Sequence, residues 1–322
     1  MCSYSSSDFS DEESQAMKED QRMHIPVVLF AYKRLDTLRV TLDSLRKNNV
    51  GLLIVYSDAA KSEADVHAVN EVRELISQID WCDTELHFAE RNKGLGQSIK
   101  DGLDSVFSRF EAAIVCEDDL EFVEGTLKYL AMALAHYAND RRVMSVTGYT
   151  NANITPGDVG SDPYFDGRFE CWLWGTWRRV WKDMQSHTAL EMMNIVKDRG
   201  EDPYAWGGDL PYMAKTELRG NIWAVRMCYL HIMNHGLCLR PPWSMVNHIG
   251  WGDGSTNCCA KNWEYNGVLK NAPPIPAVWP EPLVNNGTSR LNRMMYKRPW
   301  ADVFPRMVPL ARRWLRRMGI KA

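Results

Sequence analysis

From Ala112 to Asp119 the sequence reads AAIVCEDD, an apolar run of five residues that ends abruptly in three acids. A short, continuous apolar run is typical of a strand that is covered on both faces in a parallel sheet. Three consecutive carboxylates are costly at such a place unless they face water, a cation or hydrogen-bond donors. The stretch therefore predicts a buried strand that ends at a polar site.

Strand-like and helix-like segments alternate on both sides of this stretch. Earlier apolar runs lie at 25–31, 52–56 and 85–88, the last of them weak. Between the first two runs, leucines recur at helical spacing, and Asp36 or Thr37 is the expected N-cap. Repeated strand–helix–strand units predict an α/β fold with a mainly parallel sheet and helices on both faces. In such sheets ligands bind at the carboxyl ends of the strands.

The chain divides into three regions by composition. Residues 1–23 are acidic and serine-rich and are expected to form a disordered tail. Residues 24–270 carry the alternating strand-like and helix-like segments over 24–145 and a tryptophan-rich part over 146–270, and are expected to form one continuous unit. Residues 271–322 form a proline-rich extension that ends in a basic amphipathic segment.

Composition excludes several classes of protein. Of the 322 residues 45% are hydrophobic and 25% charged, as in soluble globular proteins, and the net charge of −3 argues against nucleic-acid binding. No stretch resembles a signal peptide or a membrane span, so we expect a cytoplasmic protein. The eight cysteines form no CxxC pair, which favours reduced thiols over a zinc module or a disulfide framework.

The acidic triplet Glu117-Asp118-Asp119 is the strongest chemical signal. Mg²⁺ and Mn²⁺ commonly take one or two protein carboxylates and complete their shells with substrate phosphates and water. An acidic strand end facing a nucleotide diphosphate matches this mode of coordination. The alternative is a solvated acidic turn, which the position at the carboxyl edge of a sheet makes the weaker interpretation.

Two further polar positions are candidates for donor binding. The loop 91–97 precedes a helix, and Gly94 and its neighbours would let backbone approach a phosphate or nucleobase, with Gln97 beside them. Its spacing is neither GxGxxG nor a Walker A loop, so a plain glycine-rich helix start is the alternative. Asp58 follows a buried strand and could bind a base or ribose, or merely cap the next helix.

These motifs resemble a known family. The segments 25–34, 57–58, 95–97 and 117–121 are similar in order and spacing to N-acetylglucosaminyltransferase I and to related, family 2-like inverting glycosyltransferases of the GT-A (Rossmann-like) fold. The similarity extends through Trp174 to Asp183, 206–209 and 238–241, and so spans about residues 24–257. It implies a glycosyltransferase domain at 24–270, with a nucleotide-sugar-binding half at 24–145 and an acceptor and catalytic half at 146–270.

The resemblance implies a role for each matching residue. Arg34 and Asp58 would contact the uridine of a UDP-sugar, and Asp118 its ribose. Glu117 would support the sugar or the base, and Asp119 would bind the metal directly. The chain departs from the family at Tyr32-Lys33, where the family has a Cys-Asp pair.

Asp209 matches the family's catalytic base. A base must deprotonate the acceptor hydroxyl as it attacks the anomeric carbon from the face opposite the leaving diphosphate, and one such displacement inverts that centre. Gly208 stands where the family has a second acid. The alternative for Asp209 is a helix N-cap before Leu210-Pro211.

The glycine-rich stretch 247–255 has the composition of a mobile lid that orders over bound donor. His248 could add a metal or diphosphate contact, or simply face solvent. Trp174, Trp177 and Trp181 recur at spacings of three and four, which favours a core stripe. Trp206 and Trp251, beside glycines, are the better candidates for stacking on a sugar.

The sequence from 312 to 318 reads RRWLRRM and could lie on an anionic membrane, or form a basic surface helix or tail.

Together the motifs predict a metal-dependent, inverting transferase that moves a hexose or N-acetylhexosamine from a UDP-sugar to a saccharide or lipid-linked saccharide, in polysaccharide or glycoconjugate assembly. It would use Mn²⁺ or Mg²⁺ and work in the cytoplasm or at the inner membrane face; the oligomeric state stays open. A sugar-nucleotide nucleotidyltransferase and a non-catalytic saccharide-binding protein are the alternatives.

Overall fold

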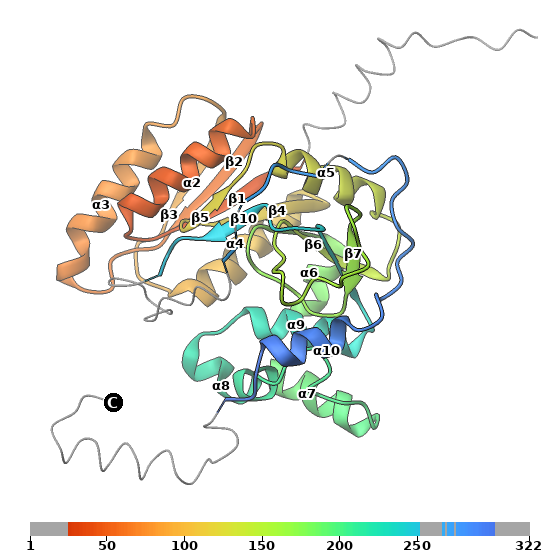
Figure 1. Cartoon of the computed structure of the whole chain (residues 1–322). Helices are drawn as coiled ribbons and strands as arrows, with labels where there is room; N and C mark the ends of the chain where they lie inside the picture. The colour runs from red at the N-terminus through yellow and green to blue at the C-terminus, as the bar shows by residue number, and fades with distance from the viewer. Residues whose placement is uncertain (1–24, 252–265, 268, 274, 300–322) are drawn as a thin grey trace, which may run out of the picture.

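An eight-stranded sheet forms the centre of the structure, a computed structural model that describes residues 25–251, 266–267, 269–273 and 275–299 (Figure 1). The strands lie in the order β3 (Asp83–Phe88), β2 (Leu52–Ser57), β1 (Val27–Ala31), β4 (Ala112–Glu117), β8 (Trp174–Trp177), β6 (Val143–Thr147), β9 (Leu237–Arg240) and β7 (Tyr164–Asp166). The first four run parallel, β8 runs antiparallel to both of its neighbours, β9 is parallel to β6, and β7 is antiparallel to β9. The sheet is thus mainly parallel, as predicted.

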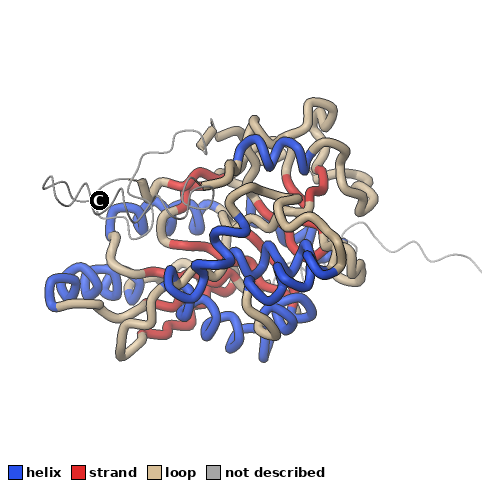
Figure 2. Tube along the Cα trace, turned by 90° about the horizontal axis from the view of Figure 1, so that it is seen from below, coloured by secondary structure: helices blue, strands red, loops and turns tan. Residues whose placement is uncertain are grey.

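Helices surround the sheet on both faces, with the strands running through the middle of the molecule in Figure 2. They are α2 (Leu35–Lys47), α3 (Glu63–Ser77), α4 (Leu95–Arg109), α5 (Thr126–His136), α6 (Arg178–Met184), α7 (Ala189–Asp198), α8 (Leu210–Gly220), α9 (Ala224–Met233) and α10 (Thr288–Met295). A separate ribbon of β5 (Leu120–Phe122) and β10 (Val246–His248) follows the end of β4. The predicted fold class, an α/β GT-A (Rossmann-like) sheet flanked by helices, is confirmed.

Burial explains why the apolar runs form the inner strands. All five residues of β1 are buried, because β1 pairs with β2 on one side and β4 on the other and is covered by helices on its faces. Outer strand β3 is mostly exposed, which accounts for its weak apolar signal. Trp174, Trp177 and Trp181 are at most 4% exposed, so their interpretation as a core stripe is confirmed.

The start of α2 differs from the prediction. Neither Asp36 nor Thr37 is the N-cap, because α2 begins at Leu35 and Arg34 occupies the capping position without a side-chain cap. The Arg34 guanidinium instead bonds Asp119 and the carbonyl of Gly250. The residue at the N-cap position of α2 thus makes tertiary contacts and no capping bond.

The segment beyond residue 275 packs along the tryptophan-rich half. Val284 bridges to Phe165 of β7, Asn285 donates its backbone N–H to the Phe165 carbonyl, and Asn292 of α10 donates to Asp166 of β7. The described residues of the predicted extension are therefore in contact with the predicted catalytic domain. Within the described ranges no helix is long and apolar enough to cross a membrane.

Candidate active site

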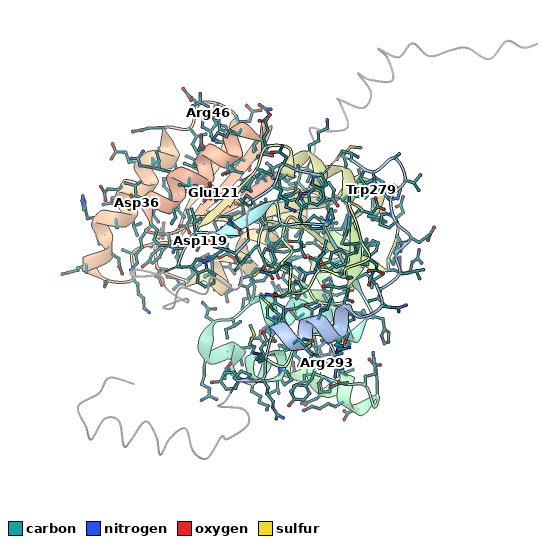
Figure 3. The ribbon with its side chains drawn as sticks, viewed as in Figure 1. Asp36, Arg46, Asp119, Glu121, Trp279 and Arg293 are labelled. Carbon is teal, nitrogen blue, oxygen red and sulfur yellow. The ribbon has the colours of Figure 1, made fainter. Side chains whose placement is uncertain are left out.

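The acidic triplet lies at the carboxyl end of β4, next to the end of β1. Tyr32 follows β1 and donates its backbone N–H to Asp118 Oδ2 over 2.8 Å. Arg34 forms an ion pair with Asp119 Oδ2 and donates to the Gly250 carbonyl at 2.9 Å. The parallel pairing of β1 and β4 brings these ends together. In Figure 3 Asp119 lies within the body of the molecule, close to the ribbon of β5 and β10.

His248 reaches the same carboxylate from the other side. Antiparallel pairing of β10 with β5 places His248 opposite Leu120, and its Nε2 lies 3.1 Å from Asp119 Oδ2. The next backbone N–H, of Ile249, donates to the Asp119 carbonyl at 2.8 Å. The structure thus joins Arg34, Asp119 and His248, three predicted site residues that are up to 214 positions apart in sequence, from 34 to 248.

Two buried polar atoms of this cluster have no hydrogen-bond partner among the described residues. They are Asp119 Oδ1 and His248 Nδ1. Because an unsatisfied buried polar atom costs about 1–3 kcal/mol, such atoms call for a ligand, ion or water. Asp119 Oδ2 thus has its polar partners, whereas Oδ1 has none among the described residues.

Aromatic rings hold the imidazole in place. Trp172 stacks on His248 with ring centroids 5.0 Å apart, and Trp251 meets His248 edge to face at 4.5 Å. Leu173, directly after Trp172, has a left-handed backbone with φ of 47°, and Gly148 donates its N–H to the Leu173 carbonyl at 2.8 Å. This backbone conformation, unusual for a leucine, fixes the orientation of the Trp172 side chain.

Ionisation of all three carboxylates would give the cluster more negative charge than its cations offset. Burial, with repulsion from Asp119, raises the pKa of Glu117 to about 8 and that of Asp118 to about 7. Burial would also raise the pKa of Asp119, but the hydrogen bond from His248 and the charges of His248 and Arg34 hold it below its usual value. Asp119 is therefore the ionised member, and a further cation would stabilise the charged forms of the other two.

A divalent cation fits this arrangement. No group of three or more His, Cys, Asp and Glu side chains converges as a metal site anywhere in the part of the chain that the structure describes. A metal here would take Asp119, with Oδ1 available, and would need substrate phosphates and water for the rest of its shell. Mg²⁺ and Mn²⁺ are commonly bound in that way at nucleotide sites.

Asp58 organises the predicted donor loop. Its carboxylate accepts the backbone N–H groups of Lys93, at 2.9 Å, and Gly94, at 2.8 Å, and the side-chain amide of Asn92 at 3.1 Å. These bonds attach the loop 91–97 to the end of β2, and Asp58 caps no helix. Gly94 has a φ of 75°, which favours glycine at this turn. Gln97 is exposed and donates to Asp101 on the surface of α4.

Asp209 occupies the N-cap position of α8, but its side chain makes no capping bond. Instead Arg168 holds both carboxylate oxygens, with Nη1 3.0 Å from Oδ1 and Nη2 2.9 Å from Oδ2. Arg168 also donates to the Trp206 carbonyl at 3.0 Å. The side chain of Asp209 is 20% exposed and that of Arg168 only 8%, so the aspartate is the more accessible member of the pair.

Several site residues were not singled out from the sequence. Arg168 pairs with Asp209, Trp172 packs on His248, and a Cβ added to Gly250 would clash with Asp119 and Arg34. Asp166, Arg168 and Glu170 recur at every second position within the aromatic-rich stretch 164–174, and this alternation was the available signal for Arg168. Residues 252–255 of the predicted lid, the acidic tail and the basic segment 312–318 lie outside the described residues.

Comparison with known proteins supports no family assignment. No family model matches the chain, and no curated protein matches its sequence. Among solved structures it is similar to the mannosyltransferase PcManGT from Pyrobaculum calidifontis in complex with GDP-Man and Mn²⁺, with 13% identity, a TM-score of 0.42, and coverage of 72% of this chain and 58% of that one. The match thus spans less than two thirds of the mannosyltransferase.

A second similar structure is 4-diphosphocytidyl-2C-methyl-D-erythritol synthase from Anaerococcus prevotii. It has 11% identity and a TM-score of 0.33, and the match covers 52% of this chain and 77% of that one. Both TM-scores are below 0.5, so neither likeness carries a functional assignment for this chain. The resemblance to the N-acetylglucosaminyltransferase I family stays a prediction.

Proposed function

We propose that this protein is an inverting, metal-dependent glycosyltransferase that moves a hexose or N-acetylhexosamine from a UDP-sugar to a saccharide or lipid-linked saccharide. The observation that carries the proposal is the buried, unpartnered Oδ1 of Asp119 in an acidic cluster at the carboxyl end of a parallel strand. An electron-rich, incompletely satisfied site at that edge of the sheet suits a cation and the diphosphate it accompanies.

The donor would be bound from three sides. Arg34 and Asp118 come from the ends of β1 and β4, and the loop held by Asp58 comes from the end of β2. Asp119, with His248 beside it, would hold the metal, which when bound supplies positive charge against the charge that grows on the leaving diphosphate. Glu117 would support the sugar or the base.

Asp209 would act as the base toward the acceptor hydroxyl. Its carboxylate is partly exposed, its plane is set by Arg168, and it is not used to cap α8. Each carboxylate oxygen accepts from more than one direction, so the paired arginine leaves lone pairs available for a substrate proton. A single displacement with such a base inverts the anomeric carbon.

Thermal shift with a panel of donors tests the proposal. UDP-glucose, UDP-galactose and their N-acetylhexosamine counterparts would each be added with and without Mn²⁺, with GDP-mannose and CTP as further arms. We expect one UDP-sugar to raise the Tm only when Mn²⁺ is present. Stabilisation by CTP with release of pyrophosphate would instead indicate a nucleotidyltransferase, and no metal-dependent stabilisation by any nucleotide would reject the assignment.

A lipid-linked acceptor would lie at a membrane surface, and membrane binding can be tested separately. We propose that the basic segment 312–318 brings the enzyme to an anionic membrane surface, with tryptophan, leucine and methionine inserted among headgroups. Truncation after Arg306 should then reduce binding to vesicles that contain anionic lipid while leaving donor binding unchanged. Equal vesicle binding by the truncated and full chains would remove membrane docking and leave the transferase assignment in place.

A further inference from the structure

The last described segment reaches the residue next to the candidate base. Gly208 donates its backbone N–H to the Tyr296 carbonyl at 2.7 Å. A Cβ added to Gly208 would lie 2.6 Å from the backbone nitrogen of Arg298, so only glycine allows this close approach. The chain that follows α10 therefore holds the backbone from which Asp209 projects.

The same segment holds the arginine that binds Asp209. The guanidinium of Arg168 lies 3.6 Å from the centroid of the Tyr296 ring, while its two terminal nitrogens bond the Asp209 carboxylate. Burial would lower the pKa of Arg168, but the charge of Asp209 outweighs it and holds the pKa well above its ordinary value. Arg168 is thus a permanent cation, fixed in plane by the ring beneath it.

A second layer of buried polar contacts fixes the backbone of Arg168. The fully buried Asp166 accepts the backbone N–H of Arg168 at 3.0 Å on one oxygen, and the side chains of Arg240, at 2.6 Å, and Asn292, at 3.2 Å, on the other. Asn292 belongs to α10 and Tyr296 directly follows it, so α10 and its C-terminal end contribute to both layers. Buried, mutually satisfied charges of this kind are strongly coupled.

We infer that Arg168 is a positioning residue that orients the Asp209 carboxylate for catalysis, and that Tyr296 orients Arg168 in turn. The inference rests on the proposed function, because it takes Asp209 as the base. A bidentate guanidinium removes the rotational freedom of the carboxylate and leaves its solvent-facing lone pairs for the substrate. Misplacement of a reacting group by about 1 Å can cost about 100-fold in rate, so this orientation matters for kcat.

The test uses release of UDP from the UDP-sugar that Mn²⁺-dependent thermal shift selects, with water in place of the acceptor. The variants are Asp209→Asn, Arg168→Lys, Tyr296→Leu, the double variant R168K/D209N, and Tyr296→Phe as the matched control. Arg168→Lys keeps the charge but loses the two-pronged geometry. Tyr296→Phe keeps the ring under Arg168 and removes the hydroxyl that donates to Glu170 at 3.4 Å.

We expect Asp209→Asn to lower kcat by about 100-fold or more. Arg168→Lys and Tyr296→Leu should each lower kcat by about tenfold or more at an unchanged donor KM, and Tyr296→Phe should stay within about twofold of wild type. In the double variant the lysine should add nothing to the loss caused by Asp209→Asn, because Arg168 acts through that carboxylate. Donor-induced thermal shift with Mn²⁺ reports on folding, and the tyrosine pair carries the test if Arg168→Lys does not fold.

Each other result has a defined meaning. Wild-type kcat in folded Arg168→Lys or Tyr296→Leu, or losses that add in the double variant, would overturn the positioning role while Asp209 remains the base. Wild-type kcat in Asp209→Asn would overturn the base assignment and the inference together, with donor binding intact. If the wild-type enzyme releases no UDP from any sugar, the transferase proposal and the inference both fail.

Discussion

At the scale of single residues, the two oxygens of Asp119 have different environments. Oδ2 is held by Arg34 and His248, whereas Oδ1 is buried and has no partner among the described residues. The first set of contacts orients the carboxylate and keeps it ionised, and the second oxygen remains available to a ligand. A carboxylate that served only as a structural ion-pair partner would be expected to use both oxygens.

Replacing Asp119 by Asn should abolish the Mn²⁺-dependent rise in Tm that the donor produces, because the amide brings no charge to the metal. The matched control is Asp43→Asn, which changes an exposed carboxylate of α2 that pairs with Lys47. Differential scanning fluorimetry with and without Mn²⁺ measures the effect. A full metal-dependent shift in Asp119→Asn would contradict this role.

Gly250 makes a second prediction at this scale. A Cβ at Gly250 would clash with Asp119 and with the guanidinium of Arg34, so Gly250→Ala should weaken Mn²⁺-dependent donor binding by about 10- to 100-fold. Gly267→Ala is the control, because a Cβ there meets nothing within 4 Å. Isothermal titration with the donor compares the two, and equal affinities would show that the site tolerates displacement of Arg34.

At the scale of elements, close packing of helices on the sheet determines where the strand ends lie. Gly102 of α4 faces Phe30 of β1, and a Cβ at Gly102 would lie 2.8 Å from an atom of that ring. The helix can approach the sheet closely only because this position lacks a side chain. The loop that Asp58 holds leads directly into α4, so this packing also sets the position of the loop.

Gly102→Ala should therefore destabilise the protein, although alanine is the better helix former. The favourable helix propensity is worth about 1 kcal/mol, whereas overpacking against Phe30 costs about 1–3 kcal/mol and should prevail. Urea unfolding measures the free energy of unfolding, with Gly157→Ala as a control in open space. Greater stability in Gly102→Ala than in wild type would show that the ring moves aside at little cost.

At the scale of the whole molecule, His231 couples stability to pH. It is fully buried on α9, its Nδ1 donates to the Met227 carbonyl, and its Nε2 accepts from the Ser145 hydroxyl of β6, both at 2.8 Å. A carbonyl can only accept, so the proton of the neutral ring lies on Nδ1. Burial lowers the pKa of His231 from 6.5 to about 4.

Acid should therefore remove a defined part of the stability. Because the folded pKa lies below the unfolded one, the unfolded chain takes up the proton first, and the contribution of His231 is complete above about pH 6.5 and lost as pH falls toward 4. The loss is on the order of 3 kcal/mol. Urea unfolding at several pH values should show a steeper decline in wild type than in His231→Gln, and parallel curves would refute the assignment.

The spacing of apolar residues predicted the strands and the core well wherever neighbouring residues in sequence determine which side chains are buried. The apolar runs became the inner strands β1, β2 and β4, and the tryptophan stripe became core. The start of α2 was mispredicted: the helix begins at Leu35, and Arg34 at its N-cap position bonds a distant carboxylate. Asp58, Asp209 and Arg168 show the same limit, since their hydrogen-bond partners are not sequence neighbours that a motif can reveal.

The sequence by itself determined the succession of strands and helices and the acidic end of β4, because these follow from the spacing of apolar residues and from the cost of burying charge. Only the tertiary structure decided what each oxygen of those acids meets. Asp119 is bracketed by residues 34 and 248, and Asp209 by residues 168 and 296, which the sheet order and the packing of α10 bring together. The stretch 112–119 supplies three carboxylates. The fold determines that Asp119 is the one that remains ionised with one oxygen available.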